Sequence, residues 1–557
     1  MTSIDAIQSA VQLHRAGRLD DAEAVYRRHV AANPADARVL HLLGTLLIQR
    51  RQPAAAVEFL SRAVDAAPSS PDAHFALADA LRFAGEFPAA EQAYRKSLAL
   101  RPLFPPAHNG LGLALVQQGK LDSAIVAWQR ALQLKPDHAE ALANLGAAYA
   151  QQDKSTEAAA LLRRAIAANP SFAPAHNNLA NVLDEMDDAD GAIEHWSKAI
   201  ELQPNYFDAL VNLSKALHLR GREDESLALI ERAIAIRPAD PDARFLRGLA
   251  LLTRGDLVAG FSDYRFRLHC PELNLQTRTF PQRAWSGQDV EGLTLLLHTE
   301  QGLGDAIQFV RYASRLADRG ANVLVEAPPE LKSLMQSAAG VESVYARGEA
   351  LPPFDLHATM LELPRVFGTT LATIPANVPY LAPDPQRAQA WGQIVQSDPP
   401  GRRIGLVWSG NPRHSNDRNR SVLLRQLEPL AEQQDCSFYS LQKGVAAGQA
   451  SDSTLKLKLI DHTPLLTDFA ETAALISHLD LVISVDTSVA HLAGAMGTPV
   501  WVLLPHVADW RWMTGRNDSP WYPTMRLLRQ PTIGDWESVV QAVREMLPTN
   551  CTNFTNE

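Results

Sequence analysis

Prolines at a constant interval constrain the fold of the first half of this chain more than any other feature. They recur every 34 positions, at Pro34, Pro68, Pro102, Pro136, Pro170, Pro204 and Pro238. Proline ends helices because it lacks an N–H group and clashes with the preceding turn. A fixed interval of this length is typical of solenoids that stack one repeated supersecondary unit. The interval therefore predicts a helical solenoid over nearly half of the chain.

Two further columns keep the same step and indicate how the helices pack. Small residues recur at Gly44, Ala78, Gly112, Gly146, Ala180, Ser214 and Gly248, and large residues recur at Tyr26, Leu60, Tyr94, Trp128, Leu162, Trp196, Ile230 and Tyr264. This is the tetratricopeptide pattern, in which small residues let the two helices of a repeat approach and the large residue fills the seam. We expect an all-α tetratricopeptide superhelix over residues 1–268, with about seven and a half repeats.

The turn between the two helices of a repeat has its own column. Glycine occupies it in five repeats, at Gly17, Gly85, Gly119, Gly221 and Gly255, and Arg51, Asp153 and Asp187 occupy it in three others. Glycine is the residue that most easily adopts a left-handed backbone. The exceptions indicate that this geometry is tolerated rather than compulsory at the turn.

Three successive repeats carry an asparagine in one slot of the first helix, Asn144, Asn178 and Asn212. Stacked repeats form a concave groove lined by these helices, which suits an extended peptide. Asparagine side chains can hydrogen-bond a peptide main chain without reading its sequence. In this the chain resembles the O-linked N-acetylglucosamine transferases, whose superhelix holds peptides in this way. The alternative is that the asparagines brace neighbouring helices.

Composition excludes several classes of protein. The formal net charge of −10 makes attraction of the whole molecule to nucleic acid or an anionic membrane unexpected. Cys270, Cys436 and Cys551 are too scattered for a disulfide framework or a paired-cysteine zinc site. No signal-peptide pattern and no apolar stretch of membrane-spanning length occurs. We expect a cytoplasmic protein.

After Tyr264 the periodicity ends and short apolar runs alternate with amphipathic segments, which is typical of parallel sheets with crossover helices. Strands are expected at residues 294–297, 322–325, 355–358, 404–407, 437–441, 481–484, 500–503 and 525–528, and helices at 306–319, 468–476 and 488–496. We expect a linker over 269–290, Rossmann-like lobes over 291–388 and 400–548, and a polar tail over 549–557. Two such lobes that face each other form the GT-B fold of glycosyltransferases.

Residues 482–505 are the most informative segment of the second lobe and read VISVDTSVAHLAGAMGTPVWVLLP. Their order of acid, hydroxyl, histidine and Gly-x-Pro resembles the donor site of the family 9 heptosyltransferases. Thr487 and Ser488 would begin a helix, where free N–H groups favour phosphate. His491 would share that helix face and donate to phosphate or sugar. The alternative is that Asp486 caps the helix and that His491 is an interior histidine.

Residues 299–309 form a glycine-rich loop in the first lobe and read TEQGLGDAIQF. Ile307 stands where the dinucleotide fingerprint needs its third glycine, so a nicotinamide site is disfavoured. The loop resembles the Gly-Asp loop of the heptosyltransferases, which implies that Gly302 and Gly304 shape the site and that Asp305 accepts the proton of the acceptor hydroxyl. The alternative is that Asp305 is a helix N-cap.

Cations stand at two places in the second lobe. Residues 408–420 contain Arg413 and Arg418, which could clamp donor phosphates, and Arg511 stands in an aromatic cluster that could cover the donor or could only hold a lid. No acidic run with metal-ligand spacing occurs, so we expect no metal and no cofactor besides the donor.

Together the two halves predict a glycosyltransferase that holds a protein in the helical groove and glycosylates its Ser or Thr. In order and length the chain is similar to bacterial flagellin glycosyltransferases of the FlmG type, which implies flagellin as the acceptor and, by family analogy, inversion at the sugar. The donor could be a CMP-nonulosonic acid or another nucleotide sugar. The alternatives are a heptosyltransferase acting on lipopolysaccharide and a non-catalytic adaptor with a decayed enzyme domain.

Overall fold

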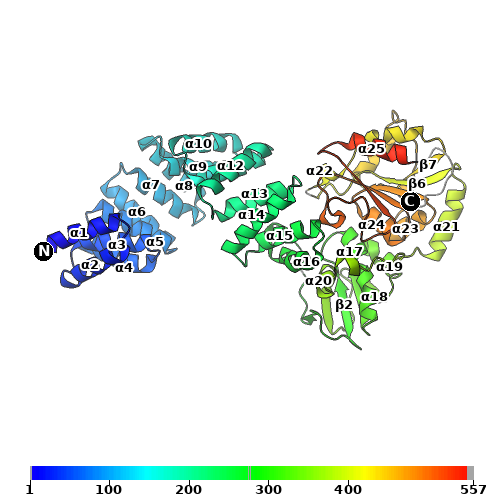
Figure 1. Ribbon diagram of the computed structural model, residues 1–557, viewed down its shortest axis with the longest axis horizontal. Coiled ribbons are helices and arrows are strands. Elements are labelled where there is room, and N and C mark those ends of the chain that lie inside the picture. The colour runs from blue at the N-terminus through cyan, green and yellow to red at the C-terminus, as the bar shows by residue number, and fades with distance from the viewer. Residues whose placement is uncertain (1–2, 274, 276–277, 415, 548–557) are drawn as a thin grey trace. The chain divides into compact units, whose positions relative to one another are not determined.

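The computed structural model describes residues 3–273, 275, 278–414 and 416–547, and the predicted tail lies outside these ranges. The chain divides into two compact units, Met1–Leu213 and Ser214–Glu557, which are described separately (Figure 1). The second unit therefore contains the last helices of the repeat pattern together with the whole α/β part. No helix of the described ranges has the length and apolar character needed to cross a membrane.

The repeat region consists of helices in antiparallel pairs, as the sequence predicted. Its helices are α1(Ser3–Arg15), α2(Leu19–Ala32), α3(Ala37–Gln49), α4(Pro53–Ala66), α5(Pro71–Phe83), α6(Phe87–Leu100), α7(Pro105–Val116), α8(Leu121–Leu134), α9(Ala139–Ala150), α10(Ser155–Ala168), α11(Ala173–Glu185), α12(Ala189–Leu202), α13(Phe207–His218), α14(Glu223–Ile236), α15(Pro241–Thr253) and α16(Leu257–Tyr264). From α2 to α14, every second helix ends two residues before one of the periodic prolines.

The small and large columns pack against each other within each repeat. A Cβ atom on Gly112 would lie 2.4 Å from Nε1 of Trp128, and one on Gly44 would lie 2.3 Å from Cγ of Leu60. Every member of the large column is buried, with at most 4% of its surface exposed. The predicted role of the small residues, close approach of two helices, is confirmed.

The turn column adopts a left-handed backbone whether or not glycine occupies it. The five glycines have φ between 72° and 88°, and Arg51, Asp153 and Asp187 have φ of 56°, 58° and 62°. This corrects the expectation that the geometry is optional at the non-glycine positions. The two flanking helices set the backbone angles, and the side chain has to accept them.

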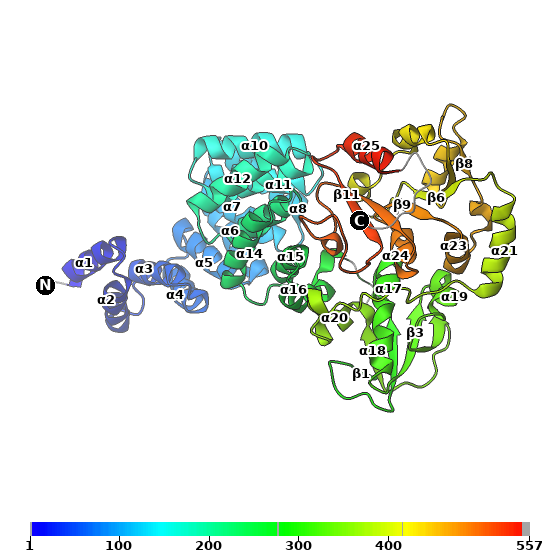
Figure 2. The same ribbon diagram turned by 45° about the vertical axis from the view of Figure 1, so that its right-hand side comes forward.

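The first parallel sheet has the strand order β1-β5-β2-β3-β4 (Figure 2). Its strands are β1(Arg283–Ala284), β2(Thr294–His298), β3(Asn322–Ala327), β4(Val341–Ala346) and β5(Leu356–Thr359), and its helices are α17(Leu303–Phe309), α18(Ala313–Ala317), α19(Lys332–Met335) and α20(Leu363–Val366). The helix predicted over 306–319 begins three residues earlier and is interrupted by a 3-10 turn, Val310–Tyr312. Strands β1 and β4 were not predicted.

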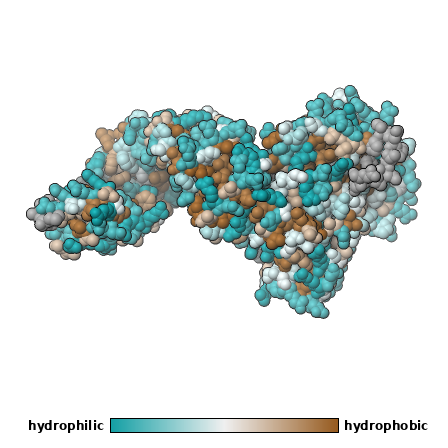
Figure 3. Space-filling model, viewed as in Figure 1, coloured by the Kyte–Doolittle hydropathy of each residue, from teal (hydrophilic) through white to brown (hydrophobic). Residues whose placement is uncertain are grey.

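The second parallel sheet has the order β11-β10-β9-β6-β7-β8. Its strands are β6(Arg402–Val407), β7(Cys436–Ser440), β8(Leu459–Ile460), β9(Leu481–Val485), β10(Val500–Leu504) and β11(Met525–Arg529), and its helices are α21(Pro385–Gln396), α22(Asp417–Arg420), α23(Phe469–Ile476), α24(Ser488–Ala495) and α25(Trp536–Met546). Parallel sheets need helices on both faces. Hydrophilic residues cover much of the visible surface of the α/β part, with hydrophobic residues between them (Figure 3).

One apolar core connects the last repeat with both sheets. It includes Phe261 and Tyr264 from α16, Leu295 from β2 and Val482 from β9, each with 4% or less of its surface exposed. Helices α15 and α16 are therefore part of the core of the α/β unit although their sequence follows the repeat pattern.

The packing of the columns predicts that two glycine substitutions differ in effect. Gly112→Ala would overpack the seam against Trp128 and should destabilise the α7–α8 pair by about 1–3 kcal/mol. In Gly85→Ala the new Cβ atom has no other atom within 4 Å. The stability should fall by roughly 1 kcal/mol, because alanine disfavours the left-handed backbone at this position. Hydrogen–deuterium exchange of each helix pair in the full chain measures both. A smaller effect for Gly112→Ala than for Gly85→Ala would contradict the seam packing.

Candidate functional site

Each sheet has one point where the order of its strands reverses, and open parallel sheets bind ligands outside the carboxyl ends of the strands at this point. In the first sheet the point lies between β2 and β5, and in the second sheet between β6 and β9. The glycine-rich loop follows β2, the basic segment follows β6, and Asp486 follows β9. The sequence-predicted site segments therefore all begin at the expected ligand-binding edges.

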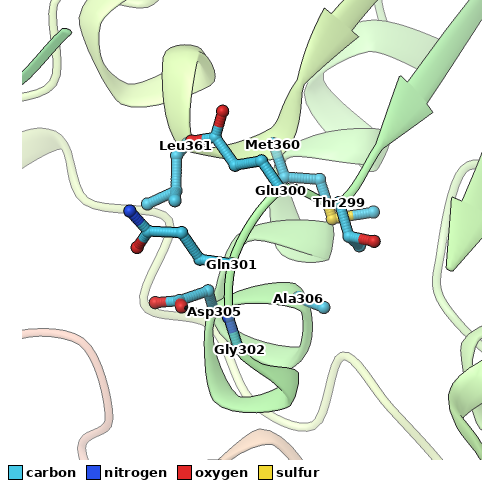
Figure 4. A pocket seen from close by; sticks show the side chains of 8 residues that line it. All are labelled: Thr299, Glu300, Gln301, Gly302, Asp305, Ala306, Met360 and Leu361. Atoms are coloured by element: carbon cyan, nitrogen blue, oxygen red, sulfur yellow. Dashed lines mark hydrogen bonds between the residues drawn. The ribbon is translucent and has the colours of Figure 1, made fainter. Parts of the chain in front are cut away.

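A pocket lies at the reversal point of the first sheet (Figure 4). It is a small depression that is open to solvent, and its lining residues are Thr299, Glu300, Gln301, Gly302, Asp305, Ala306, Met360 and Leu361. The first six belong to the loop after β2 and the start of α17, and the last two follow β5. Asp305 lies at the edge of this pocket, where a small polar group would fit beside its carboxylate.

Asp305 connects the first sheet region with the second. Its Oδ2 accepts the backbone N–H of Gly302 at 2.9 Å, and its Oδ1 pairs with Nη2 of Arg511. Gly302 is the N-cap of α17 and Asp305 is its third residue, so Asp305 supports the helix start without being the N-cap. Burial raises the pKa of Asp305 and Arg511 opposes this rise. The alternative prediction that Asp305 is the N-cap is therefore wrong, and its role as a base stays a prediction.

Arg511 is buried between three partners. Besides Asp305, it donates through Nη1 to Asp509 at 2.8 Å and through Nε to Gln308 at 3.0 Å. Burial disfavours the charge of Arg511, but Asp305 and Asp509 outweigh burial and raise its pKa. Burial also opposes the charge of Asp509, and Arg511 nevertheless holds the pKa of Asp509 below its usual value. Arg511, in the segment after β10, thus remains a fixed cation that is paired with the acid at the reversal point of the first sheet.

A second acid stands beside this cation. Burial, followed by the charge of Asp509, raises the pKa of Asp486 to about 6, and Arg420 opposes the rise. Arg420 is half-buried and pairs with Asp417 at 3.3 Å, whereas Arg413 and Arg418 are exposed. Of the cations after β6, the one whose charge acts on Asp486 is therefore Arg420, a residue of the motif that the sequence reasoning did not select.

The helix start after β9 agrees with the predicted phosphate site. Thr487 is the N-cap of α24, but its side chain caps no N–H of the helix. Its Oγ1 instead lies 2.9 Å from Oγ of Ser484. Thr487 and Ser488 are half-buried, and the first turn of α24 has no side-chain cap. Such a helix terminus favours an anion through its N–H groups and dipole.

His491 lies in the interior, between α24 and α17. Its Nδ1 is 2.9 Å from the hydroxyl of Tyr522, and its ring stacks on Trp512 with centroids 5.2 Å apart. Only 4% of its surface is exposed. A Cβ atom on Gly304 would lie 2.8 Å from Cδ2 of His491, so this glycine lets α17 approach α24. These contacts are those of the alternative prediction, and phosphate donation by His491 stays a prediction.

The three asparagines that were predicted to line a groove hydrogen-bond other asparagines. Nδ2 of Asn144 donates to Asn109 at 2.9 Å, and Nδ2 of Asn212 donates to Asn181 at 3.0 Å. Oδ1 of Asn178 accepts from its neighbour Asn177 at 3.4 Å. The first two bonds connect first helices of successive repeats, which is the bracing role that the sequence left open. All three predicted side chains are half-buried.

Three family models match parts of the chain. One described as the C-terminal domain of cilia and flagella-associated protein 70 matches residues 3–209, and a tetratricopeptide repeat model matches residues 185–252. The helical part is built of tetratricopeptide repeats. A model described as glycosyltransferase family 9 (heptosyltransferase) matches residues 463–504, the stretch that contains β9, α24 and β10.

Individual relatives match parts of the chain as well. Protein FlbA of Caulobacter vibrioides (strain ATCC 19089 / CIP 103742 / CB 15) is 28% identical over 327 residues, which are 55% of this chain and 54% of FlbA. The chain thus spans about half the length of this curated relative. Among solved structures, the APC/C hetero-tetramer Cut9–Hcn1 is similar at 19% identity and a TM-score of 0.40, over 47% of this chain and 52% of that chain. Pseudomonas aeruginosa pilF is similar at 21% identity and a TM-score of 0.34, over 38% of this chain and 96% of that chain.

The environment of His491 predicts how stability depends on pH. Burial, followed by the charge of Arg511, lowers the pKa of His491 to about 3, whereas an unfolded histidine titrates near ~6.5. As pH falls below ~6.5 the unfolded chain gains a proton that the folded chain does not bind, so stability falls by up to about 1.4 kcal/mol per pH unit. His491→Gln should flatten this dependence. Tryptophan-fluorescence melts from pH 4 to 8 measure it, and parallel curves for both proteins would contradict the assignment.

Proposed function

We propose that this protein is a GT-B glycosyltransferase that moves a sugar from a nucleotide donor to Ser or Thr of a protein, with flagellin as the acceptor. The observation that carries the proposal is the junction of two ligand-binding edges through Asp305 and Arg511. It joins an acid beside a pocket to a cation near a helix N-terminus, and the segment that contains this helix matches the family 9 model.

The donor site of the proposal lies on the second sheet. The N–H groups at the start of α24 and the hydroxyls of Thr487 and Ser488 would take the phosphate of the donor. Arg420 and Arg511 would offset the charge that grows on the leaving nucleotide. The segment holding Arg413 and Arg418 follows β6 at the same edge and would contact the nucleotide from solvent. We propose that the donor is a CMP-nonulosonic acid or another nucleotide sugar and that transfer needs no metal.

Asp305 would act as the base on the first sheet. The acceptor hydroxyl oxygen attacks the anomeric carbon, the bond from that carbon to the phosphate oxygen breaks, and the hydroxyl proton passes to Asp305. Because burial raises the pKa of Asp305, its carboxylate holds a proton more readily than an exposed aspartate does. Attack opposite to the leaving phosphate would invert the sugar.

The proposal assigns the acceptor two separate contacts, one in each unit of the chain. The pocket beside Asp305 would receive the Ser or Thr side chain. The helical groove would hold the flanking polypeptide in the cytoplasm, and Asn144, Asn178 and Asn212 would bind its main chain where they exchange their present amide partners. An adaptor would need no base beside the pocket, and a lipopolysaccharide enzyme would need no groove for a polypeptide.

Replacement of the proposed base tests the reaction. Asp305→Asn keeps the shape of the side chain and should reduce transfer about a hundredfold or more, because the base is lost. Intact mass of flagellin co-expressed with wild type or variant measures transfer, and calorimetry with CMP, UDP, GDP and ADP measures nucleotide binding. We expect a mass increment with wild type only, unchanged by chelators.

Three outcomes would contradict parts of this assignment. Nucleotide binding without modification of any protein would favour the lipopolysaccharide enzyme, and the absence of nucleotide binding would favour the adaptor. Full activity of Asp305→Asn would remove Asp305 from the role of base while leaving the transferase proposal in place.

The asparagines can be tested separately from the chemistry. Replacing Asn144, Asn178 and Asn212 together with alanine should weaken flagellin binding about tenfold or more, because several charge-neutral hydrogen bonds are lost at about 1 kcal/mol each. Nucleotide affinity should not change. Pull-down titration with immobilised flagellin measures the effect. Unchanged flagellin binding with a lower melting temperature of the repeats would show that the asparagines only brace the helices.

A further inference from the structure

The last helical repeat is followed by a charged side chain, Arg267, which contacts the loop that leads to Asp305. Arg267 lies in the 3-10 turn after α16, Arg265–His269, and only 1% of its surface is exposed. Its Nε donates to Oε1 of Glu300 at 2.8 Å, and its Nη2 contacts the same oxygen. Its Nη1 donates to the backbone oxygen of Tyr264 at 3.1 Å. A guanidinium this deeply buried is tolerated only when it is paired.

Glu300 is one of three loop residues whose side chains are bound by residues outside the loop. It lies five residues before Asp305 in the loop that lines the pocket, and 3% of its side chain is exposed. The next residue, Gln301, is 3.4 Å from the hydroxyl of Tyr264 through its Oε1. Two successive loop residues are therefore held from the last repeat. Arg511 holds the other end of the loop through Asp305.

Aromatic side chains of the same repeat contact both sheet regions. The ring of Phe261 packs edge-on against Phe309 of α17, at 6.5 Å between centroids, and against Trp510, at 5.4 Å. The backbone N–H of Thr514 donates to the backbone oxygen of Thr253 at 3.2 Å. Figure 1 and Figure 2 show α16 beside α17 and α20. One repeat therefore contacts each side of the junction at which Asp305 and Arg511 meet.

We infer that Arg267 and Tyr264 of the last repeat are positioning residues for the loop 299–305, which carries Asp305. The effect on catalysis rests on the proposed function, whereas the effect of Arg267 and Tyr264 on the position of the loop does not. Arg267 acts through Glu300 and not on the substrate. Glu362 also faces Arg267, at 3.4 Å from Nη1, and completes its charge balance. The last repeat therefore has two roles, as the end of the solenoid and as a support for the loop that lines the pocket.

Removing the charge of Arg267 tests the inference in the full chain. Arg267→Met keeps the length of the side chain but leaves Glu300 unpaired. Hydrogen–deuterium exchange of residues 299–309 should become about tenfold faster or more, because these amides depend on the held loop. In transfer assays kcat should fall about tenfold or more while KM for the donor stays within about threefold. Arg267→Lys should recover part of both effects.

Arg244→Met is the matched control. Arg244 lies in the same repeat and pairs with Asp263 at 3.0 Å, inside the repeat and away from the loop. It should leave exchange of residues 299–309 unchanged. Equal exchange in Arg267→Met and wild type, or equal acceleration by Arg244→Met, would overturn the inference.

A milder variant covers the case in which Arg267→Met does not fold. Tyr264→Phe keeps the ring between α16 and Trp510 and removes only the hydroxyl next to Gln301. It should accelerate exchange of residues 299–309 about threefold, and no acceleration would count against the inference. The exchange experiment needs neither donor nor acceptor. If wild type transfers no sugar but the exchange difference is found, the proposed function fails and the positioning role stands.

Discussion

The partly buried ion pair between Asp305 and Arg511 is the interaction on which the rest of the site depends. It joins residues 206 positions apart, one in the loop region after β2 of the first sheet and one in the segment after β10 of the second sheet. A buried charge without its partner is strongly unfavourable, so each residue requires the other to be in place. The position of the Asp305 carboxylate therefore depends on how the two sheets are placed relative to each other. Asp509 and Gln308 then fix the guanidinium from the remaining sides.

The sequence predicted the repeats well because each column reports a local requirement. Proline ends a helix, and a small residue lets the two helices of a repeat approach each other. Both effects act within one repeat. The strands after Tyr264 were predicted for a similar reason, since each buried strand is a short apolar run. Strand β8, with two residues, and the polar edge strand β4 lack such a run and were missed. The left-handed turns at Arg51, Asp153 and Asp187 were underestimated because helix packing overrides the preference of the side chain.

The details of the site depend on contacts between distant segments, and spacing does not reveal these. The sequence places Arg413, Arg418 and Arg420 in one segment, but only the fold determines that Arg420 acts on Asp486. Tyr522 stands 31 residues after His491, and Arg267 stands 33 residues before Glu300. Arg267 also lies just inside the predicted repeat boundary, so its sequence context suggested a residue of the solenoid. An arginine placed three residues after the last periodic position, Tyr264, is the signal in the sequence that could have indicated it.

The close approach of α17 and α24 also restricts how the chain can vary in length. Successive residues of an α-helix are rotated by about 100° around its axis. In α17 this rotation directs Gly304 toward His491 and Asp305 toward Arg511. An inserted or deleted residue between Gly302 and Phe309 would present a side chain to the histidine and turn the acid away from the arginine. Insertions are thus expected to accumulate among homologues in the exposed connections and to be absent from this one turn of helix.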